Sequence, residues 1–237
     1  KMNLENDLKA GVQMILLVED NIRFYSSFLP MLYKFILQQS LNFATEALNN
    51  TLETLRMRGR PKIVLARNYE EAWQVYQQYS DNTMGVISDC RFPISKDSEK
   101  IANAGVQLLK AIRAQDPFLP LILDSSEEEN VKYAVECDAM FINKNSKSLD
   151  HDLSKIILHK FGFGDFIFRH ADTLEPMVRI HNLKELQDNI FTLPREALLF
   201  HITRNNVSRW LCSRALFPIS EFLKKITWQS LQDVDKH

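Results

Sequence analysis

Five short runs of apolar residues recur between residues 14 and 142, and longer amphipathic stretches separate them. Each run has four or five residues, which is too short for the core of a helix and typical of a strand covered on both faces. The runs lie at residues 14–18, 62–66, 84–88, 119–123 and 139–142. Strands that alternate with helices predict an α/β fold in which a five-stranded parallel sheet is doubly wound.

Apolar residues at helical spacing fill the intervals between these runs. The spacing predicts helices at residues 69–80, 105–114, 128–136 and 149–160. Pro117 ends the second of them, because a proline and the residue before it do not continue a helix.

The interval after the first run, residues 22–58, is longer than a helix that only has to cover a sheet of this size. Within residues 22–58 only Pro30 interrupts the helical pattern, and it falls early enough to kink a helix rather than end it. One interpretation is a single long helix, or a bent pair, whose inner part packs on the sheet. The other is that its distal part, with Leu48, Leu52 and Leu55, forms a partner surface through which two copies of the chain associate as a homodimer.

The C-terminal third of the chain has a different sequence pattern. The aromatic, glycine-bearing stretch 161–168 predicts a loop that leads into a short extended segment, and residues 183–191 and 195–216 have helical patterns. The sequence therefore divides into a first domain at residues 13–161 and a mainly helical extension at residues 162–226. Large apolar residues of the extension would be exposed if it swung free, so we expect it to pack onto the first domain.

Glycine is scarce, and this excludes the commonest nucleotide-binding loops. Six glycines among 237 residues amount to about 2.5%, against roughly 7% in average usage. Neither GxxxxGK[ST] nor GxGxxG occurs, and HExxH, GxSxG and paired Cys/His zinc spacings are also absent from the sequence. We therefore expect no glycine-loop nucleotide binding, zinc binding or serine hydrolysis of these types.

Charge and cysteine usage limit the partners and the compartment. With 29 basic and 30 acidic residues, the chain has no global field that would attract nucleic acid or a membrane surface. No apolar run approaches the roughly 18 residues of a membrane-spanning helix. The three cysteines have no CxxC spacing, and their odd number excludes a fully paired disulfide framework, so we expect a reducing, cytoplasmic compartment.

Polar residues follow four of the five predicted strands. In chain order they are Glu19 and Asp20, then Asp89, then Asp124, Ser125 and Ser126, and finally Asn143 and Lys144. The carboxyl ends of the strands in a doubly wound sheet share one edge, and ligands bind there. Carboxylates gathered at that edge repel one another, and a hard divalent cation with oxygen ligands resolves the conflict. An aspartate beside such a cation, with a lysine and a hydroxyl nearby, can accept a phosphoryl group.

This set of residues resembles the site of the receiver domains of two-component response regulators. The resemblance covers about residues 13–161 and implies a flavodoxin-like fold, with an elongated first helix and the helical extension added to it. It implies a role in phosphorelay signal transduction, with Asp89 as the phosphoacceptor. It also implies that Lys144 and Ser125 contact the phosphoryl group and that Phe141 is the switch aromatic residue.

The resemblance further implies a metal cofactor and two kinds of partner. Mg²⁺ would be held by Glu19, Asp20 and Asp89, together with the backbone carbonyl of Arg91. An upstream histidine kinase or a small phosphodonor would supply the phosphoryl group, and a downstream domain or partner protein would receive the signal. The chain is then a phosphoprotein that accepts a phosphoryl group, and we do not expect it to turn over a substrate.

The sequence departs from the family pattern at several places. Its first helix is longer than usual, and the helical segment within residues 125–137 is shorter. Lys144 is followed by Asn145 where the family has proline, and Ser126 stands where alanine or glycine is usual, which narrows access to Asp89. These departures concern phosphorylation and the output surfaces more than the fold.

A second, narrower resemblance covers nearly the whole chain. Four stretches are similar to the N-terminal receiver-like region of large proteins related to phosphoenolpyruvate synthase and pyruvate phosphate dikinase. They lie at residues 60–66, 85–93, 161–166 and 204–211. This similarity implies that the chain is a regulatory fragment and that phosphotransferase modules follow it.

Two other functions stay open at this point. A receiver-like fold that keeps the acidic residues without being phosphorylated would be an interaction scaffold that regulates a phosphoenolpyruvate synthase-like phosphotransferase. The segment at residues 204–214 can be mistaken for a DNA-recognition helix, which would make the chain a DNA-binding response regulator. Residues 163–237, however, carry ten basic and nine acidic residues rather than a clear basic face, so nucleic acid is not expected as a partner.

Overall fold

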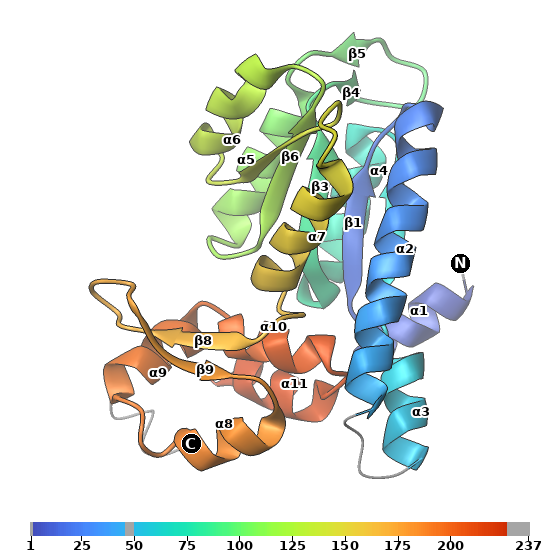
Figure 1. Ribbon diagram of the computed structural model, residues 1–237. Helices are drawn as coiled ribbons and strands as arrows, with labels where there is room; N and C mark the ends of the chain where they lie inside the picture. The colour runs from blue at the N-terminus through green and yellow to red at the C-terminus, as the bar shows by residue number, and fades with distance from the viewer. Residues whose placement is uncertain (1, 46–49, 227–237) are drawn as a thin grey trace. The chain divides into compact units, whose positions relative to one another are not determined.

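The computed structural model describes residues 2–45 and 50–226, and the chain divides into two compact units between Ile157 and Leu158 (Figure 1). The first unit is built on a five-stranded sheet whose pairs are all parallel. Its strands are β1 (Met14–Val18), β2 (Lys62–Ala66), β3 (Thr83–Asp89), β6 (Leu121–Ser125) and β7 (Met140–Asn143). Their order, β2-β1-β3-β6-β7, reverses direction between β1 and β3, which is the point where doubly wound sheets bind ligands. The predicted flavodoxin-like fold is confirmed.

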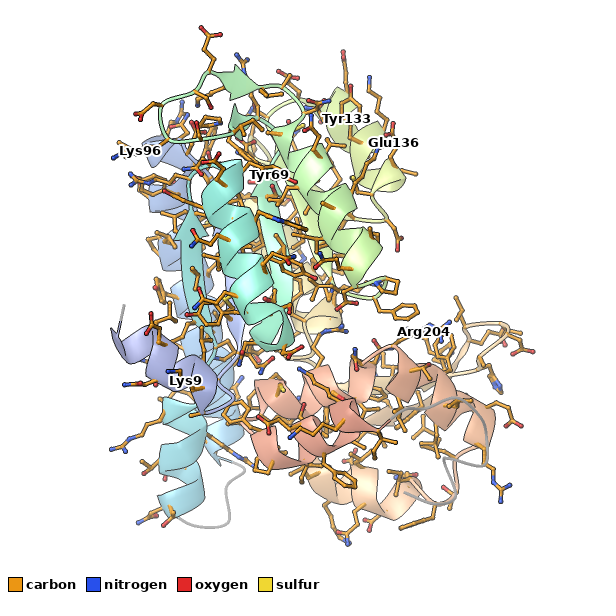
Figure 2. All side chains as sticks on the ribbon, turned by 180° about the vertical axis from the view of Figure 1, so that it is seen from behind. Lys9, Tyr69, Lys96, Tyr133, Glu136 and Arg204 are labelled. Atoms are coloured by element: carbon orange, nitrogen blue, oxygen red, sulfur yellow. The ribbon has the colours of Figure 1, made fainter. Side chains whose placement is uncertain are left out.

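Helices cover both faces of this sheet. Figure 1 shows α2 (Ile22–Thr45) and α7 (Leu149–Lys160) on one face, with α4 (Tyr69–Tyr79) and α5 (Ala104–Gln115) on the other. Figure 2, which views the molecule from behind, has Tyr69 on α4 and both Tyr133 and Glu136 on α6 (Val131–Glu136). Leu16, Val86 and Leu123 alternate with their neighbours and face α4 to α6, so the pleat of the strands decides which side chains enter which core layer.

The long segment after β1 forms two helices. The helix α2 continues through Pro30, and α3 (Asn50–Arg58) packs back against it, with the Arg56 guanidinium donating a hydrogen bond to the Phe43 carbonyl. The bent pair is therefore the correct interpretation rather than a single long helix. Leu48 and the side chains of Leu52 and Leu55 lie outside the described residues, so the predicted self-association surface stays a prediction.

A helix and a two-stranded hairpin of the first unit have no counterpart among the predicted elements. A helix, α1 (Met2–Lys9), precedes the sheet, and the Asn82 amide donates hydrogen bonds to the carbonyls of Leu8 (2.9 Å) and Val12 (3.1 Å). A hairpin of β4 (Phe92–Pro93) and β5 (Lys100–Ile101) connects β3 to α5. The predicted helix at 128–136 is a turn of 3₁₀ helix (Glu128–Asn130) followed by α6.

Arg113 ties the loops at the opposite end of the sheet to α5. Its guanidinium donates hydrogen bonds to the backbone carbonyls of Asp116 (3.2 Å), Leu119 (2.9 Å), Cys137 (3.3 Å) and Asp138 (2.8 Å). These carbonyls belong to the segments that lead into β6 and β7. Arg113 therefore fixes where those two strands begin.

The described part of the second unit, up to residue 226, pairs a small antiparallel sheet with four helices. The strands are β8 (Phe166–Arg169) and β9 (Pro176–Ile180), and the helices are α8 (Leu183–Asn189), α9 (Arg195–Thr203), α10 (Asn206–Ser213) and α11 (Phe217–Lys225). The single helix predicted at 195–216 is wrong, because Asn205 adopts a left-handed conformation with φ 56° and separates α9 from α10. The strand β9 and the helix α11 were not predicted.

Trp210 and Arg214 hold the turn that opens the second unit. The Trp210 indole donates to the Gly164 carbonyl (2.9 Å), and the Arg214 guanidinium lies 3.8 Å from the centre of the Trp210 ring. Arg214 also donates to the carbonyls of Gly162 and Gly164, at 3.1 Å each. Trp210 is buried with Phe166 and Phe168, so the apolar residues of this unit form a core of their own. Whether the extension also packs onto the first domain stays a prediction.

All three cysteines, Cys90, Cys137 and Cys212, are buried free thiols. Among the described residues, no helix is long and apolar enough to span a membrane.

Candidate functional site

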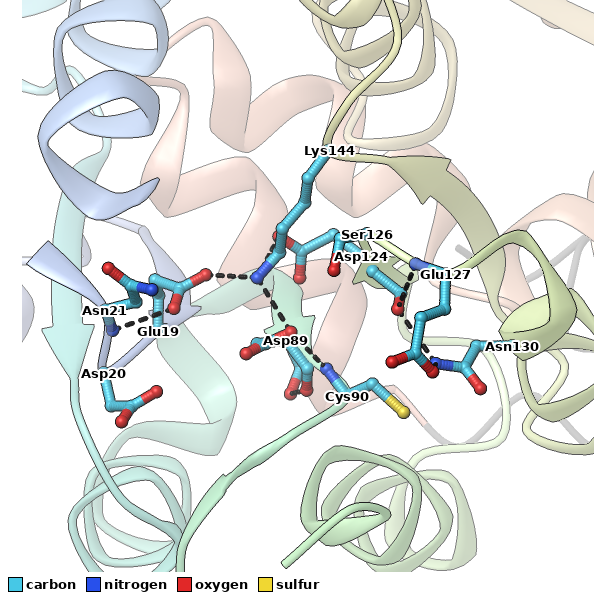
Figure 3. A network of polar contacts seen from close by, with 12 residues as sticks. Glu19, Asp20, Asn21, Asp89, Cys90, Asp124, Ser126, Glu127, Asn130 and Lys144 are labelled. Carbon is cyan, nitrogen blue, oxygen red and sulfur yellow. Dashed lines mark hydrogen bonds and ion pairs between the residues drawn. The ribbon is translucent and has the colours of Figure 1, made fainter. Parts of the chain in front are cut away.

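Acidic side chains and one lysine converge at the carboxyl edge of the five-stranded sheet (Figure 3). Glu19 follows β1, Asp89 ends β3, Asp124 lies in β6 and Lys144 follows β7. Asp89 and Asp124 are direct neighbours across the β3–β6 pair. The residues meet because parallel strands bring their carboxyl ends to the same edge, as predicted.

Lys144 is the buried cation at the centre of this cluster. Its ammonium lies 2.7 Å from Asp89 Oδ1 and 3.6 Å from Asp124 Oδ2, and it forms an ion pair with Glu19 Oε2. The ring centre of Phe24 on α2 lies 4.5 Å from the ammonium. Burial alone would lower the pKa of Lys144, but the charges of the surrounding carboxylates, Asp124 first, outweigh it and raise that pKa. Lys144 is therefore a permanent positive charge in the site.

Glu19, Asp20 and Asp89 form a group that fits a divalent cation. Each offers one carboxylate oxygen, and the three oxygens lie within 4.8 Å of one another. Asp20 Oδ1 is buried, and no hydrogen-bond partner is recorded for it among the described residues. Oxygen donors of this type and spacing suit Mg²⁺ and similar hard cations. These three predicted metal ligands are thus brought together.

The environment of Glu19 explains why the group needs positive charge. Its side chain is fully buried and accepts a hydrogen bond from the Asn21 backbone amide (2.9 Å). Burial raises the pKa of Glu19, and the negative charge of Asp89 raises it further, whereas Lys144 acts in the opposite direction. A second cation beside the carboxylates would relieve both effects.

Asp89 is fixed by its own strand end and by α5. Asp89 Oδ1 accepts a hydrogen bond from the Cys90 backbone amide (2.8 Å) in addition to the contact with Lys144. At the start of α5, a Cβ atom on Gly105 would stand 1.9 Å from the Asp89 carbonyl oxygen. Only glycine allows the helix to approach the strand this closely, so Gly105 sets the position of Asp89.

Asp124 is the site residue to which the sequence assigned no role. Its side chain is fully buried, and no hydrogen-bond partner is recorded for either carboxylate oxygen among the described residues. Burial raises the pKa of Asp124 to about 8, and Asp89 and Glu19 add to the effect although Lys144 opposes it. Burial is therefore the main reason that Asp124 holds a proton more readily than an ordinary aspartate.

Ser125 and Phe141 lie on the same face of two neighbouring strands. Asn143 is the partner of Ser125 and Leu123 is the partner of Phe141 across the β6–β7 pair, so alternation places both side chains towards α5 and α6. The Ser125 hydroxyl accepts hydrogen bonds from the Glu127 backbone amide (3.1 Å) and the Asn130 side-chain amide (2.9 Å). In this structure, Ser125 is therefore engaged by the loop that follows β6. Its contact with a phosphoryl group stays a prediction.

The remaining predicted residues lie in the loops around the site. Arg91 comes two residues after Asp89, and its side chain is exposed. Ser126 is exposed at the end of β6, and its carbonyl accepts a hydrogen bond from the Asn145 side chain (3.3 Å). The role of the Arg91 carbonyl as a metal ligand stays a prediction.

Crystal structures of response regulators are similar to part of this chain. A receiver domain protein from Clostridium thermocellum is 20% identical, covers 61% of this chain and 90% of its own, and gives a TM-score of 0.37. A CheY-like receiver domain protein from Methanospirillum hungatei is 19% identical, with coverages of 62% and 90% and a TM-score of 0.37. The phosphorylated cyanobacterial phytochrome response regulator RcpA is 17% identical, with coverages of 61% and 91% and a TM-score of 0.41.

The structural neighbours of this chain are response regulator receiver domains. No family model and no curated protein matches the sequence. The similarity to the phosphoenolpyruvate synthase-related proteins has no support among these neighbours.

Proposed function

We propose that the first unit is a phosphoacceptor receiver domain in which Asp89 accepts a phosphoryl group from an upstream histidine kinase or a small phosphodonor. The proposal rests on one observation above all: Lys144 Nζ lies 2.7 Å from Asp89 Oδ1. The carboxylates of Glu19 and Asp20 stand beside this pair. A nucleophilic carboxylate, a fixed ammonium and a divalent-cation site are the parts that phosphoryl transfer to aspartate requires.

In the proposed reaction an oxygen of Asp89 attacks the phosphorus of the donor. The bond from phosphorus to the donor nitrogen or oxygen breaks, the donor leaves with that electron pair, and an acyl phosphate forms on Asp89. Lys144 neutralises a phosphoryl oxygen, because its ammonium already lies against the Asp89 carboxylate. A Mg²⁺ ion held by Glu19, Asp20, Asp89 and the carbonyl of Arg91 would neutralise the other oxygens.

Ser125 and Phe141 would transmit the change. The Ser125 hydroxyl leaves its contacts with the loop after β6 and donates to a phosphoryl oxygen, and Phe141, on the same face of β7, follows into the space vacated. Such a pair has two arrangements, and the charge on Asp89 biases the equilibrium between them. The signal would pass to the extension at residues 162–226, to a downstream domain, to a partner protein in the cytoplasm, or to a second copy of the chain.

A specific observation favours a second candidate, the interaction scaffold that is never phosphorylated. Two lysines already compensate the acidic group in the structure, Lys144 beside Asp89 and Lys100 beside Asp20. Lysine contacts that compensate most of the negative charge lower the need of the group for a cation. Under this alternative the chain would regulate a phosphoenolpyruvate synthase-like phosphotransferase through its surface.

Beryllofluoride, which mimics an acyl phosphate in the presence of Mg²⁺, separates the two candidates. We expect it to shift the backbone amide signals of Ser125 and Phe141 in ¹⁵N-labelled protein, and we expect no such shift in Asp89→Asn. Unchanged signals in the wild-type protein at saturating Mg²⁺ would favour the scaffold.

A further inference from the structure

The connection between β3 and α5 carries a lysine into the acidic group. Phe92 pairs with Ile101 and Pro93 with Lys100, which closes the β4–β5 hairpin, and Figure 1 shows this hairpin near the carboxyl ends of β1 and β3. Phe92 and Pro93 are buried, so the first strand of the hairpin is anchored in the core. The second strand is exposed, apart from the contact that Lys100 makes.

Lys100 pairs with a carboxylate that also belongs to the proposed cation site. Lys100 Nζ lies 2.6 Å from Asp20 Oδ2. The other oxygen of Asp20, Oδ1, is buried, and no hydrogen-bond partner is recorded for it in the described part of the chain. The side chain of Asp20 is 13% exposed, whereas that of Lys100 is 43% exposed. Lys100 therefore reaches Asp20 from the solvent side, through Oδ2 and not through the buried Oδ1.

We propose that Lys100 is a built-in competitor of the divalent cation: it pairs with Asp20 when no cation is bound and gives up this contact when a cation binds. The inference rests on the proposed cation site of Glu19, Asp20 and Asp89. It adds a residue outside that group which sets how tightly the site binds its cation.

The charges decide the direction of the effect. An ammonium that shares a carboxylate with a doubly charged cation is repelled by it at a distance of a few ångström, so each weakens the binding of the other. A partly exposed ion pair contributes little to stability, because water screens it and both side chains lose freedom. A divalent cation with three carboxylate ligands therefore displaces Lys100 at a small cost.

The exchange would reach the hairpin, because Lys100 belongs to β5. The recorded pairing of β5 with β4 involves only Ile101 and Lys100. When the ion pair with Asp20 opens, the exposed strand loses a contact that ties it to the loop after β1. Cation binding would thus change the exposed surface of the β4–β5 hairpin, beside the phosphoacceptor.

The test is a direct measurement of Mn²⁺ binding to the full chain, read from the loss of the free-ion signal in electron paramagnetic resonance. We expect Lys100→Gln to bind Mn²⁺ about tenfold more tightly than the wild type, because it removes the competing charge. Lys100→Arg keeps the charge and should stay close to the wild-type affinity. Lys96→Gln is the matched control, since Lys96 is an exposed lysine of the same connection (Figure 2).

A second readout follows the lysine itself. In ¹⁵N-labelled wild-type protein, Mg²⁺ should shift the amide signals of Lys100 and Ile101, and Asp20→Asn should abolish this shift. Equal or weaker Mn²⁺ binding by Lys100→Gln, with binding by the wild type intact, would overturn the inference and leave the proposed function standing. Failure of both proteins to bind Mn²⁺ would overturn the proposed cation site, and this inference with it.

Discussion

Asp124 and Lys144 lie side by side in the buried edge of the sheet, with 3.6 Å between Asp124 Oδ2 and the lysine ammonium. Lys144 is closer to Asp89 and also pairs with Glu19. Of the three carboxylates that contact Lys144, Asp124 therefore has the longest contact with the ammonium. An acid buried in this way is costly when ionised and is held in its protonated form. Its position makes the stability of the first unit depend on pH.

We expect Asp124→Asn to stabilise the first unit, and more so at pH 8 than at pH 5. The folded-state pKa of Asp124 is raised to about 8, so the folded protein binds this proton more tightly than the unfolded chain. Its contribution to stability is therefore fully present below about pH 4 and is lost as the pH rises towards 8. At pH 6 the stability lost in this way is about 3 kcal/mol.

The measurement is the free energy of unfolding in urea as a function of pH. The curve of Asp124→Asn should fall less between pH 5 and 8 than that of the wild type. Asp97→Asn, in an exposed position, is the matched control and should follow the wild type. Parallel curves for Asp124→Asn and the wild type would show that Asp124 is ionised in the folded protein.

Gly105→Ala should displace the phosphoacceptor strand from α5. The added Cβ would stand 1.9 Å from the Asp89 carbonyl oxygen, so helix and strand have to separate. Overpacking of this kind costs about 1–3 kcal/mol, which we expect as a lower free energy of unfolding. Gln107→Ala, on the exposed face of the same helix, is the control. An alanine at position 105 that leaves stability and the Cys90 amide signal unchanged would contradict the proposed role of Gly105.

Asn130→Ala tests whether the loop after β6 restrains Ser125. The Asn130 side chain donates a hydrogen bond to the Ser125 hydroxyl, and its loss should release the hydroxyl towards a phosphoryl group. A hydrogen bond of ordinary strength contributes about 1 kcal/mol. Because Asn130→Ala no longer has to break this bond, we expect it to bind beryllofluoride about fivefold more tightly than the wild type. The control is Asn145→Ala, which removes the bond to the Ser126 carbonyl in the same region. Weaker beryllofluoride binding by Asn130→Ala than by this control would argue that Asn130 supports the active arrangement.

The second unit should lose stability in mild acid through His201. This buried imidazole accepts a hydrogen bond at Nε2 from the Arg169 backbone amide (2.9 Å), which only the unprotonated ring can do. Burial, and then the charges of Arg169 and Arg204, lower the pKa of His201 to about 4. Because the unfolded chain binds this proton more readily, stability present above about pH 6.5 is lost as the pH falls towards 4, by about 3 kcal/mol.

The indole N–H signal of Trp210 in ¹⁵N-labelled protein, followed during urea unfolding at several pH values, measures this loss, with His201→Gln as the variant. The glutamine should remove most of the change between pH 6.5 and 4. His159→Gln serves as the control, because His159 is the exposed histidine near the end of α7. An equally steep pH dependence in His201→Gln would assign the effect to other groups.

The sheet and the convergence of its strand ends could be predicted because both follow from local rules. Runs such as residues 14–18 are too short and too apolar for anything but a buried strand, and parallel strands place Glu19, Asp89 and Lys144 at one edge. The sequence marks Asp124 as a polar residue near a strand end, but how deeply its side chain is buried depends on the packed sheet. Its place inside β6, beside Lys144, was therefore not predictable from the residues around it.

The features that were missed have weak local signals. The β4–β5 hairpin pairs only two residues on each side, so no period marks it, and the contact of Lys100 with Asp20 joins distant parts of the chain. The break between α9 and α10 depends on one left-handed residue, Asn205, within a pattern that is otherwise helical. The strand β9 has only one buried residue, Ile180, and thus lacks the alternation that identifies a strand.

Intact mass after incubation with a small phosphodonor and Mg²⁺ tests the central claim most directly. We predict a mass increment of one phosphoryl group on the wild-type chain, lost when the metal is chelated and absent from Asp89→Asn. Lys144→Met, which removes the ammonium beside Asp89, should reduce the increment strongly. An unmodified wild-type chain under conditions that phosphorylate a known receiver domain, or an equal increment on Asp89→Asn, would contradict the assignment of Asp89 as the phosphoacceptor.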